Sequence, residues 1–445
     1  MDDVYRVSRT AVFLLLVLVV SVLGCLEVTA ATAQPMPEPA RLLGLGSAIN
    51  EGGASLADEG VHPFLAYYGV FLSNPVGGRT QSAAYSHEII FGVNFDLDKL
   101  ANIPGASFTI SGVDAVGTNL SDSIGNLFYV SESYVTPTIF FYQLYWKQDL
   151  FDKSLELYAG RMTAADLFAS LPAFGWQVSG GINGNPTSIF LNAPFTSSPD
   201  ATWAAALKYR PGKDFYLATG IYQATQRLGD AAYHGVDFSI RPGDGVLLMA
   251  QAGWEPTFFG AAESPMRDQD GKRSSADDDF GLPGTYVVGG YYSNFSFSEL
   301  NGPGVQHNAY GLYAMAQQMV WRSSHDPDLN FSVWGGATYS PQQAIAQMPF
   351  MGFAGTIWQG AIPGRGLDQL LFTYLVGTLS HDYAESVVRS GGERPTAEHV
   401  LELSYAIYLT PNYTIQPDIQ YVIRPGGSGD INNALVIGLQ FVANF

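Results

Sequence analysis

The segment from Leu435 to Phe445 constrains the fold most, because one set of alternate positions along it is almost entirely large and apolar. Side chains along a β-strand point to opposite faces in turn. A tilted strand of about nine to eleven residues crosses a bilayer, and the sequence here ends on an aromatic residue. The pattern favours the closing strand of a transmembrane β-barrel. An edge strand of a soluble β-protein remains the alternative. The apolar face comprises Leu435, Ile437, Leu439, Phe441, Ala443 and Phe445.

The N-terminus has the pattern of a secretory signal peptide. Arg6 and Arg9 precede an apolar stretch over residues 11–26, and small residues follow up to Ala33. We therefore expect residues 1–33 to be cleaved. The sole cysteine, Cys25, lies in a Val-Leu-Gly-Cys sequence, so a lipoprotein processing site is an alternative. Without this segment the chain has no cysteine, and a large core or a closed hydrogen-bond ladder must replace disulfides.

The composition separates classes of membrane protein. Hydrophobic residues make up 47% of the chain and charged residues only 14%. Beyond the leader, however, no apolar run approaches the length of about 18 residues that a membrane helix needs. The apolar residues occur instead in short alternating runs with many aromatics and glycines, which suits a barrel with aromatic girdles. A net charge of −19 argues against nucleic acid or an anionic lipid surface as partner.

Residues 34–62 are rich in Pro, Gly and Ala, and we expect a short helix or plug there, near Ser55 to Glu59. Residues 63–445 carry period-two runs bounded by Gly, Pro, Asn and Asp, which predict strands. The fold class is all-β, an antiparallel transmembrane barrel of about 16 strands. Seventeen segments fit the pattern, and an even number is required, so the barrel should have 16 or 18 strands. They are 64–72, 87–97, 106–115, 139–150, 155–161, 202–210, 214–224, 236–241, 246–255, 285–297, 306–321, 329–340, 351–361, 367–380, 399–410, 413–424 and 434–445.

The connections between these segments fall into two lengths. Short ones are 211–213, 241–245 and 410–412, and long polar ones are 116–138, 162–201, 256–284 and 381–398. Outer-membrane barrels have short turns at one rim and long loops at the external rim. The sequence therefore predicts one outer-membrane domain without an internal linker.

Two segments near the end of the sequence are distinctive, VLELSYAIYLTPNYTIQPDIQYVIRPGG from Val400 and ALVIGLQFVANF at the end. They resemble the carbohydrate-selective porin family, the OprB-type outer-membrane porins, and the resemblance runs over nearly the whole chain after the leader. Segments such as FDLDKLANIPGASFTISG from Phe95, YQLYWKQDLFDKSLELYAGR from Tyr142 and GAIPGRGLD from Gly360 agree in order. Relatives commonly carry Glu where this sequence has Gln143. The resemblance implies passive, carbohydrate-preferring diffusion of mono- or small oligosaccharides across the outer membrane.

No catalytic or metal-binding motif accompanies this pattern. The sequence lacks G-x-S-x-G, H-E-x-x-H, a P-loop and G-x-G-x-x-G. An acidic loop over residues 263–279 does not match the calcium template of an EF-hand, and we interpret it as a solvated loop. We therefore expect no catalytic residue, no metal and no cofactor. A non-selective general porin and an outer-membrane hydrolase are the two alternative functions.

A channel that prefers sugars needs amide and charged groups for hydroxyls and an aromatic face for the C–H surface. Arg161 is one candidate, because it ends a strand and opens the 162–201 loop, which we expect to enter the lumen. Asp166 and Trp176 lie in the same loop. Alternatively, Arg161 forms a rim salt bridge and Trp176 packs within the loop. The sequence thus predicts sugar contacts near this loop.

The remaining candidates lie on or beside predicted strands. Gln143 and Lys147 share one face of the fourth strand, Trp203 begins the strand after the long loop, and Arg365 lies in Pro-Gly-Arg-Gly. Alternatively, Trp203 belongs to the aromatic girdle and Arg365 is a turn residue. The resemblance implies that Phe445 is read by the barrel-assembly machinery. The expected partners are small sugars, outer-membrane lipid and that machinery, in a monomer or a homotrimer.

Overall fold

The structure, a computed structural model, describes residues 55–133, 138–225, 227, 229–259 and 281–445. The expected leader 1–33, most of the 34–62 segment and the acidic loop 263–279 lie outside the described residues. A helical turn at residues 55–58 coincides with the short helix expected there. Among the described residues, no helix is long and apolar enough to cross a membrane.

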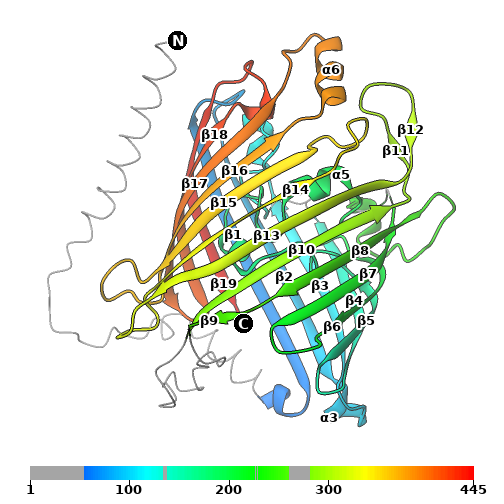
Figure 1. The fold of residues 1–445 in the computed structure, drawn as a ribbon, viewed down its shortest axis with the longest axis vertical. Helices are drawn as coiled ribbons and strands as arrows, with labels where there is room; N and C mark the ends of the chain where they lie inside the picture. The colour runs from blue at the N-terminus through cyan, green and yellow to red at the C-terminus, as the bar shows by residue number, and fades with distance from the viewer. Residues whose placement is uncertain (1–54, 134–137, 226, 228, 260–280) are drawn as a thin grey trace. The chain divides into compact units, whose positions relative to one another are not determined.

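Antiparallel strands form one closed barrel (Figure 1). Its sheet has 17 strands in the described residues, of which β9 has only two residues, so sixteen long strands make the wall. The first and last of them pair and close the ring. They are β1 (Val61–Val76), β2 (Ala83–Asp96), β3 (Ala106–Gly117), β4 (Thr138–Leu150), β5 (Leu155–Met162), β6 (Thr202–Tyr209), β7 (Phe215–Ala224), β8 (Gly245–Trp254), β10 (Leu282–Ser293), β13 (Ala309–Arg322), β14 (Asn330–Tyr339), β15 (Phe350–Gln359), β16 (Gln369–Thr378), β17 (Ala397–Thr410), β18 (Tyr413–Ile423) and β19 (Ala434–Asn444).

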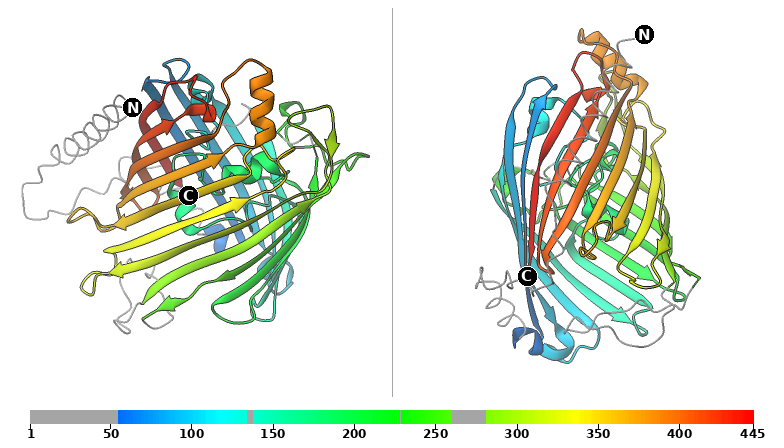
Figure 2. Two further views of the ribbon diagram at one scale, coloured as in Figure 1. Left: turned by 45° about the horizontal axis from the view of Figure 1, so that its top comes forward. Right: turned by 90° about the vertical axis from the view of Figure 1, so that its left-hand side faces the viewer.

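The two faces of β19 agree with the alternation in its sequence. Leu439 on the predicted apolar face is 44% exposed on the outside of the wall, whereas Gln440 is 5% exposed and faces inward. Phe445 extends the pairing with β1, because its backbone N–H donates to the carbonyl of Leu65 at 2.8 Å. In Figure 2, β19 and β1 lie side by side at the closure of the barrel. The prediction of a closing barrel strand is confirmed.

The predicted strand at 236–241 is wrong, and this error explains the odd count. The segment belongs to the connection between β7 and β8 and is extended without being part of the wall. Val236 and Ile240 are exposed in the same alternating manner as lipid-facing strand residues. Just before this segment, the N–H of Phe141 on β4 donates to the carbonyl of His234 at 2.9 Å, which brings the chain alongside β4. Period-two alternation therefore mimics a strand here.

Connections alternate between the two rims because neighbouring strands are antiparallel. The turns β6–β7 and β17–β18 share one rim, here called the turn rim, while β7–β8 lies at the other, the loop rim. The long connection 256–284 therefore starts and ends at the turn rim, and 241–245 belongs to the loop rim. The prediction that short turns lie at one rim and long loops at the other is therefore wrong for the connections 256–284 and 241–245.

The loop between β5 and β6, residues 163–201, enters the barrel and is here called the lumen loop (Figures 1 and 2). It contains the 3₁₀ helix η2 (Pro172–Trp176) and helix α5 (Thr187–Asn192). The ring of Phe174 packs 5.6 Å from both Trp334 and Phe353 on the inner wall. The lumen loop thus supplies much of the hydrophobic core and fills part of the barrel.

Shorter elements complete the two rims. Helix α4 (Leu120–Ile124) lies in a second lumen segment, residues 118–133, which also packs in the core. Helix α3 (Leu97–Ala101) connects β2 to β3, and helix α6 (His381–Arg389) connects β16 to β17 at the loop rim. The small pieces η3 (Ala231–Tyr233), β9 (Thr257–Phe258), β11 (Phe297–Ser298), β12 (Val305–Gln306) and η4 (Pro425–Gly427) lie in connections.

Candidate functional site in the lumen

The inner wall of the barrel is unevenly covered by the loops that enter it. Inner-facing residues on β13, β16 and β19, such as Tyr313, Leu375 and Val436, are at most 2% exposed. On β4 and β5, by contrast, the side chains of Lys147 and Glu156 keep 29% and 16% of their surface exposed. The solvent-accessible part of the lumen wall therefore includes the β4–β5 face.

Lys147 is the centre of the polar cluster on this face. Its Nζ lies 3.0 Å from Oδ1 of Asp149 on the same strand and 3.1 Å from Oε2 of Glu156 on β5. The hydroxyl of Tyr158 donates to the same Glu156 oxygen at 2.6 Å. Two carboxylates and one ammonium group are thus held in a compact network of partly exposed side chains.

Aromatic rings line the same side of the lumen. Tyr145 on β4 and Tyr158 on β5 lie with their ring centroids 6.4 Å apart, and both pack against the core formed by the lumen loop. On β6, Nζ of Lys208 lies 4.2 Å from the ring centroid of Tyr216. These rings give the wall apolar faces between its charged groups.

The lumen loop joins this wall through Gln143 and Asp166. Nε2 of Gln143 donates to Oδ2 of Asp166 at 2.8 Å, and the backbone N–H of Thr163 donates to the same oxygen at 3.2 Å. Gln143 and Lys147 are four residues apart on β4, so they share the inner face, as the sequence indicated. The structure thus brings Gln143, Lys147 and Asp166 together.

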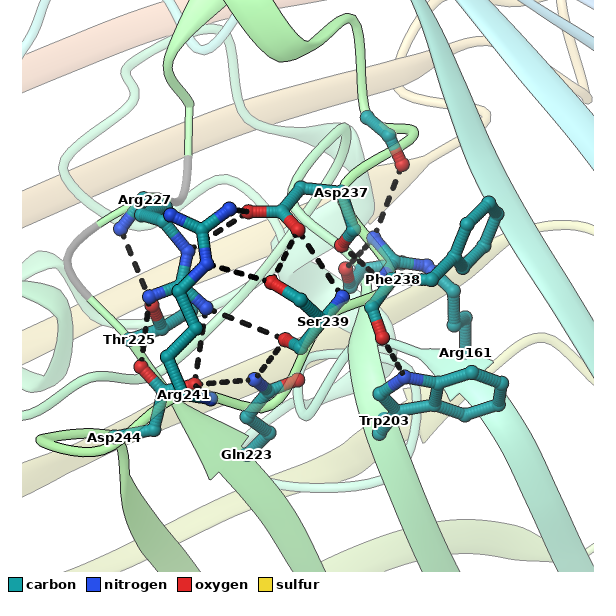
Figure 3. A network of polar contacts seen from close by, with 12 residues as sticks. Arg161, Trp203, Gln223, Thr225, Arg227, Asp237, Phe238, Ser239, Arg241 and Asp244 are labelled. Atoms are coloured by element: carbon teal, nitrogen blue, oxygen red, sulfur yellow. Dashed lines mark hydrogen bonds and ion pairs between the residues drawn. The ribbon is translucent and has the colours of Figure 1, made fainter.

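Arg161 and Trp203 lie on the opposite face of the wall. Tyr158 faces the lumen, so Arg161, three positions further along β5, faces outward, and Trp203 on β6 pairs directly with it. Both contact Phe238: the Arg161 guanidinium carbon lies 4.8 Å from its ring centroid, and the Trp203 indole N–H donates to its carbonyl at 2.9 Å (Figure 3). The guanidinium also donates to the carbonyls of Ala201, Gly235 and Asp237.

Residues 233–244, here called the strap, cover this outer site and are held by charged groups (Figure 3). Arg227 contacts Asp237 at 2.8 Å and Asp244 at 2.9 Å, and Arg241 contacts Asp237 at 2.9 Å. The hydroxyl and N–H of Ser239, together with Arg227 and Arg241, lower the pKa of Asp237 to about 2. The hydrogen bonds from Arg227 hold the pKa of Asp244 below its usual range.

Trp176 and Arg365 lie apart from the Lys147 cluster. Trp176 is half-buried in the lumen loop, where its ring lies 5.9 Å from Tyr408 of β17. Arg365 lies in the β15–β16 turn, and its Nε contacts Oδ2 of Asp368 at 2.7 Å. Arg365 thus supports a turn, while Trp176 lies inside the barrel on its β17 side.

Several wall residues were not among the candidates predicted from the sequence. The period of two alone places Tyr145 and Asp149 on the face of Lys147, and it places Glu156 and Tyr158 on one face of β5. Alternation alone does not show which of the two faces is the inner one. Among the described residues, no group of three or more His, Cys, Asp or Glu side chains is placed to hold a metal ion.

Comparisons with known proteins agree with this geometry. A family model described as "Carbohydrate-selective porin, OprB family" matches residues 80–445. The chain is 24% identical to Porin B of Pseudomonas aeruginosa, over 88% of each sequence. It is 22% identical to the "Putative porin QuiX" of Acinetobacter baylyi, over 84% of this chain and 86% of that protein.

The fold has a similar solved structure. The high-pH structure of Pseudomonas putida OprB superposes with a TM-score of 0.78 at 23% identity, covering 89% of this chain and 97% of that chain. At this identity the likeness concerns the fold, and it agrees with the closed barrel described above.

Proposed function

Because the chain belongs to the OprB family of carbohydrate-selective porins, we propose that small sugars diffuse passively along the accessible β4–β5 side of its lumen. The chain is a β-barrel of the bacterial outer membrane and a channel rather than an enzyme. The proposal concerns the path: it rests on the cluster of Lys147, Asp149, Glu156 and Tyr158, which keeps its polar groups accessible within the barrel.

The chemistry of this wall suits a neutral polyhydroxyl solute. Carboxylate oxygens of Asp149 and Glu156 accept hydrogen bonds from sugar hydroxyls, and Lys147 and Gln143 donate to them. Tyr145 and Tyr158 offer faces for the apolar C–H surface of a sugar ring. Each contact replaces one with water, so its net contribution is only about 0.5–1.5 kcal/mol. Binding is thus weak enough for the sugar to leave.

The pairing of charges explains a preference for uncharged solutes. Lys147 lies between two carboxylates at 3.0 and 3.1 Å, so the cluster exposes alternating charges rather than one sign. A wall of one sign would concentrate ions of the opposite sign in the lumen. The acidic balance of the whole chain disfavours anions further.

Swelling of proteoliposomes tests the proposed path. Liposomes that contain the protein should swell faster with glucose outside than with an uncharged polyether of matched size, because only the sugar exchanges hydroxyl contacts with the wall. The Lys147→Met and Tyr158→Ala variants should narrow this difference. Equal rates for the two solutes in the unaltered protein would favour a non-selective general porin.

The partners beyond sugar and lipid are part of the proposal. Phe445 pairs through its backbone with Leu65, and its ring lies 5.6 Å from Tyr413 in an edge-to-face contact. A terminal aromatic at the closing strand fits recognition by the barrel-assembly machinery. The channel is a monomer or a homotrimer, and mono- or small oligosaccharides of the glucose type are its expected solutes.

A further inference from the structure

Three buried carboxyl groups face the lumen from the covered side of the barrel. Glu398 and Glu402 on β17 and Asp418 on β18 are 0%, 1% and 2% exposed. Burying a charge is costly unless other groups compensate for its lost hydration. None of the three has an ion pair with a basic side chain within the described ranges, so their hydrogen bonds must supply the compensation.

Glu398 binds backbone rather than side chains. The N–H of Leu127 donates to its Oε2 at 2.8 Å, and the N–H of Phe128 donates to its Oε1 at 2.8 Å. The N–H of Gly426 also donates to Oε2, at 2.6 Å. The first two belong to the second lumen segment and the third to the connection between β18 and β19. This carboxylate therefore joins two loops to the loop-rim end of β17.

Glu402 holds the lumen loop next to Trp176. Its Oε1 accepts from the N–H of Val178 at 2.7 Å and of Ser179 at 3.2 Å. The carbonyl of Trp176 accepts from Nε2 of Gln416 on β18 at 2.8 Å. The stretch 176–179 is thus fixed to the wall through its backbone, and Trp176 is positioned with it.

The second oxygen of Glu402 faces Asp418. Oε2 of Glu402 and Oδ1 of Asp418 are both buried and accept from no donor group among the described residues, while each carboxyl group interacts with the other. Two ionised carboxylates in contact repel each other, and one proton between them turns the contact into a hydrogen bond. The two oxygens are thus placed to share one proton.

The surroundings of the pair contain no compensating cation among the described residues. Nε2 of Gln420 donates to Asp418 at 2.9 Å and also to the carbonyl of Val130 at 2.8 Å. On β16, the hydroxyl of Thr373 donates to Gln177 of the lumen loop at 2.6 Å. The other titratable groups described on this inner face are Glu398 and Tyr408, and neither is a cation.

We propose that the Glu402–Asp418 pair positions the constricting lumen loop and thereby determines how narrowly the sugar path is confined. This proposal rests on the proposed function only where block of the current by sugar is measured. Loss of the shared proton places two negative charges in contact beneath residues 176–179. The loop then moves away from β17, and the path along the opposite wall changes its width.

Two variants of Glu402 separate positioning from simple packing. Glu402→Gln keeps an oxygen for the two backbone N–H groups, and its amide donates to an ionised Asp418 without a shared proton. Glu402→Leu fills the same space but removes the acceptor. Asp418→Asn is the second variant on the other strand, since its amide donates to an ionised Glu402. If Glu402→Leu does not assemble, an alkaline transition in the unaltered channel that is absent from Asp418→Asn still tests the pair.

Single-channel currents of the reconstituted full-length proteins, with and without glucose, test the proposal in a series of buffers from neutral to alkaline pH, because burial and a neighbouring carboxylate both raise the pH at which a carboxyl group loses its proton. The single-channel current of the unaltered protein should become noisier at the alkaline end of the series. The current noise of Glu402→Gln and Asp418→Asn should not change with pH. Glu402→Leu should be noisy throughout, with sugar block weakened by about tenfold, as the loss of an acceptor for buried N–H groups implies.

Two results would overturn the positioning role. One is Glu402→Leu with the same current noise and sugar block as the unaltered protein. The other is an alkaline transition in Glu402→Gln identical to that of the unaltered protein. If glucose changes no current in any of these channels, the sugar proposal fails, and the noise of the ion current still decides whether the pair holds the loop.

Discussion

The ammonium group of Lys147 on β4 lies 3.1 Å from the carboxylate of Glu156 on the neighbouring strand β5. The contact crosses the strand pair diagonally, because Lys147 is directly opposite Tyr158 and Asp149 is opposite Glu156. Four inner-facing side chains on two strands therefore act as one unit. Predictions about selectivity follow from removing one member at a time.

Removing the charge of Lys147 should make the channel prefer cations. Lys147→Met keeps the length of the side chain but leaves Asp149 and Glu156 without their shared cation, so the local field becomes negative. The reversal potential across a KCl gradient should move toward the potassium potential. Lys213→Met, in the exposed β6–β7 turn, is the matched control. An unchanged reversal potential for Lys147→Met would contradict the placement of this residue in the ion path.

The ring of Tyr158 should contribute more to sugar binding than its hydroxyl does. Tyr158→Phe loses the bond to Glu156 but keeps the face, whereas Tyr158→Ala loses both. An aromatic contact is worth about 0.5–1.5 kcal/mol, so the alanine variant should weaken glucose block roughly two- to tenfold. Concentration series of current block measure this. Equal losses in the two variants would assign the effect to the hydroxyl instead.

Substitution of Arg161 should release the strap without changing sugar selectivity. The guanidinium donates to the carbonyls of Gly235 and Asp237 in the strap and to that of Ala201 at the end of the lumen loop, and hydrogen bonds to charged groups contribute about 1.5–3 kcal/mol each. Arg161→Met should therefore speed hydrogen exchange roughly tenfold or more at Val236 and Ser239, whose N–H groups donate within the strap, while glucose block stays the same. Arg161→Lys should restore part of the protection. A lost glucose block would show that Arg161 acts on the lumen.

The ionic contacts of the strap should respond to acid in a definite direction. The pKa of Asp237 is lowered to about 2 from an ordinary value of about 4, so its stabilising effect is present above that ordinary value. It should fade as the pH falls from about 4 through about 2. Protease cleavage within the strap measures the release. Asp237→Asn should be cleaved equally at all these pH values, and onset near neutral pH in the unaltered protein would refute the assignment.

Deletion of Phe445 should reduce assembly more than conductance. The residue contributes its backbone pairing with Leu65 and its ring contact with Tyr413 at the closure of the barrel, away from the Lys147 cluster. The amount of heat-modifiable barrel in outer-membrane fractions should fall, while the channels that form keep their conductance. Val442→Ala, on the inner side of β19, is a control for general weakening of the strand. Unchanged assembly would count against a signal in Phe445.

The strands were largely predictable because their alternation is local, and sixteen of the seventeen predicted segments correspond to wall strands. Residues 236–241 show the limit of this information. Phe238 in the middle of this segment packs against Arg161 and Phe141, which lie far away in the sequence. The alternation of the segment thus reflects packing on the outside of the wall. Alternation shows which side chains share a face of a strand but does not show which face is the inner one, and a register shift between β3 and β4 interrupts it beside Gln143. The sequence therefore could not distinguish Arg161 from Gln143. The anchoring of the lumen loop by Glu402 needs backbone geometry and could not be predicted from residue types.

The central claim is that sugars pass along the β4–β5 wall, and block of ion current by sugar tests it most directly. In a planar bilayer containing the reconstituted protein, glucose or a disaccharide should reduce the single-channel current in a saturable manner. The reduction should weaken in Tyr158→Ala and persist in Arg161→Met. The same current at every sugar concentration, or equal block in the unaltered protein and Tyr158→Ala, would contradict the account.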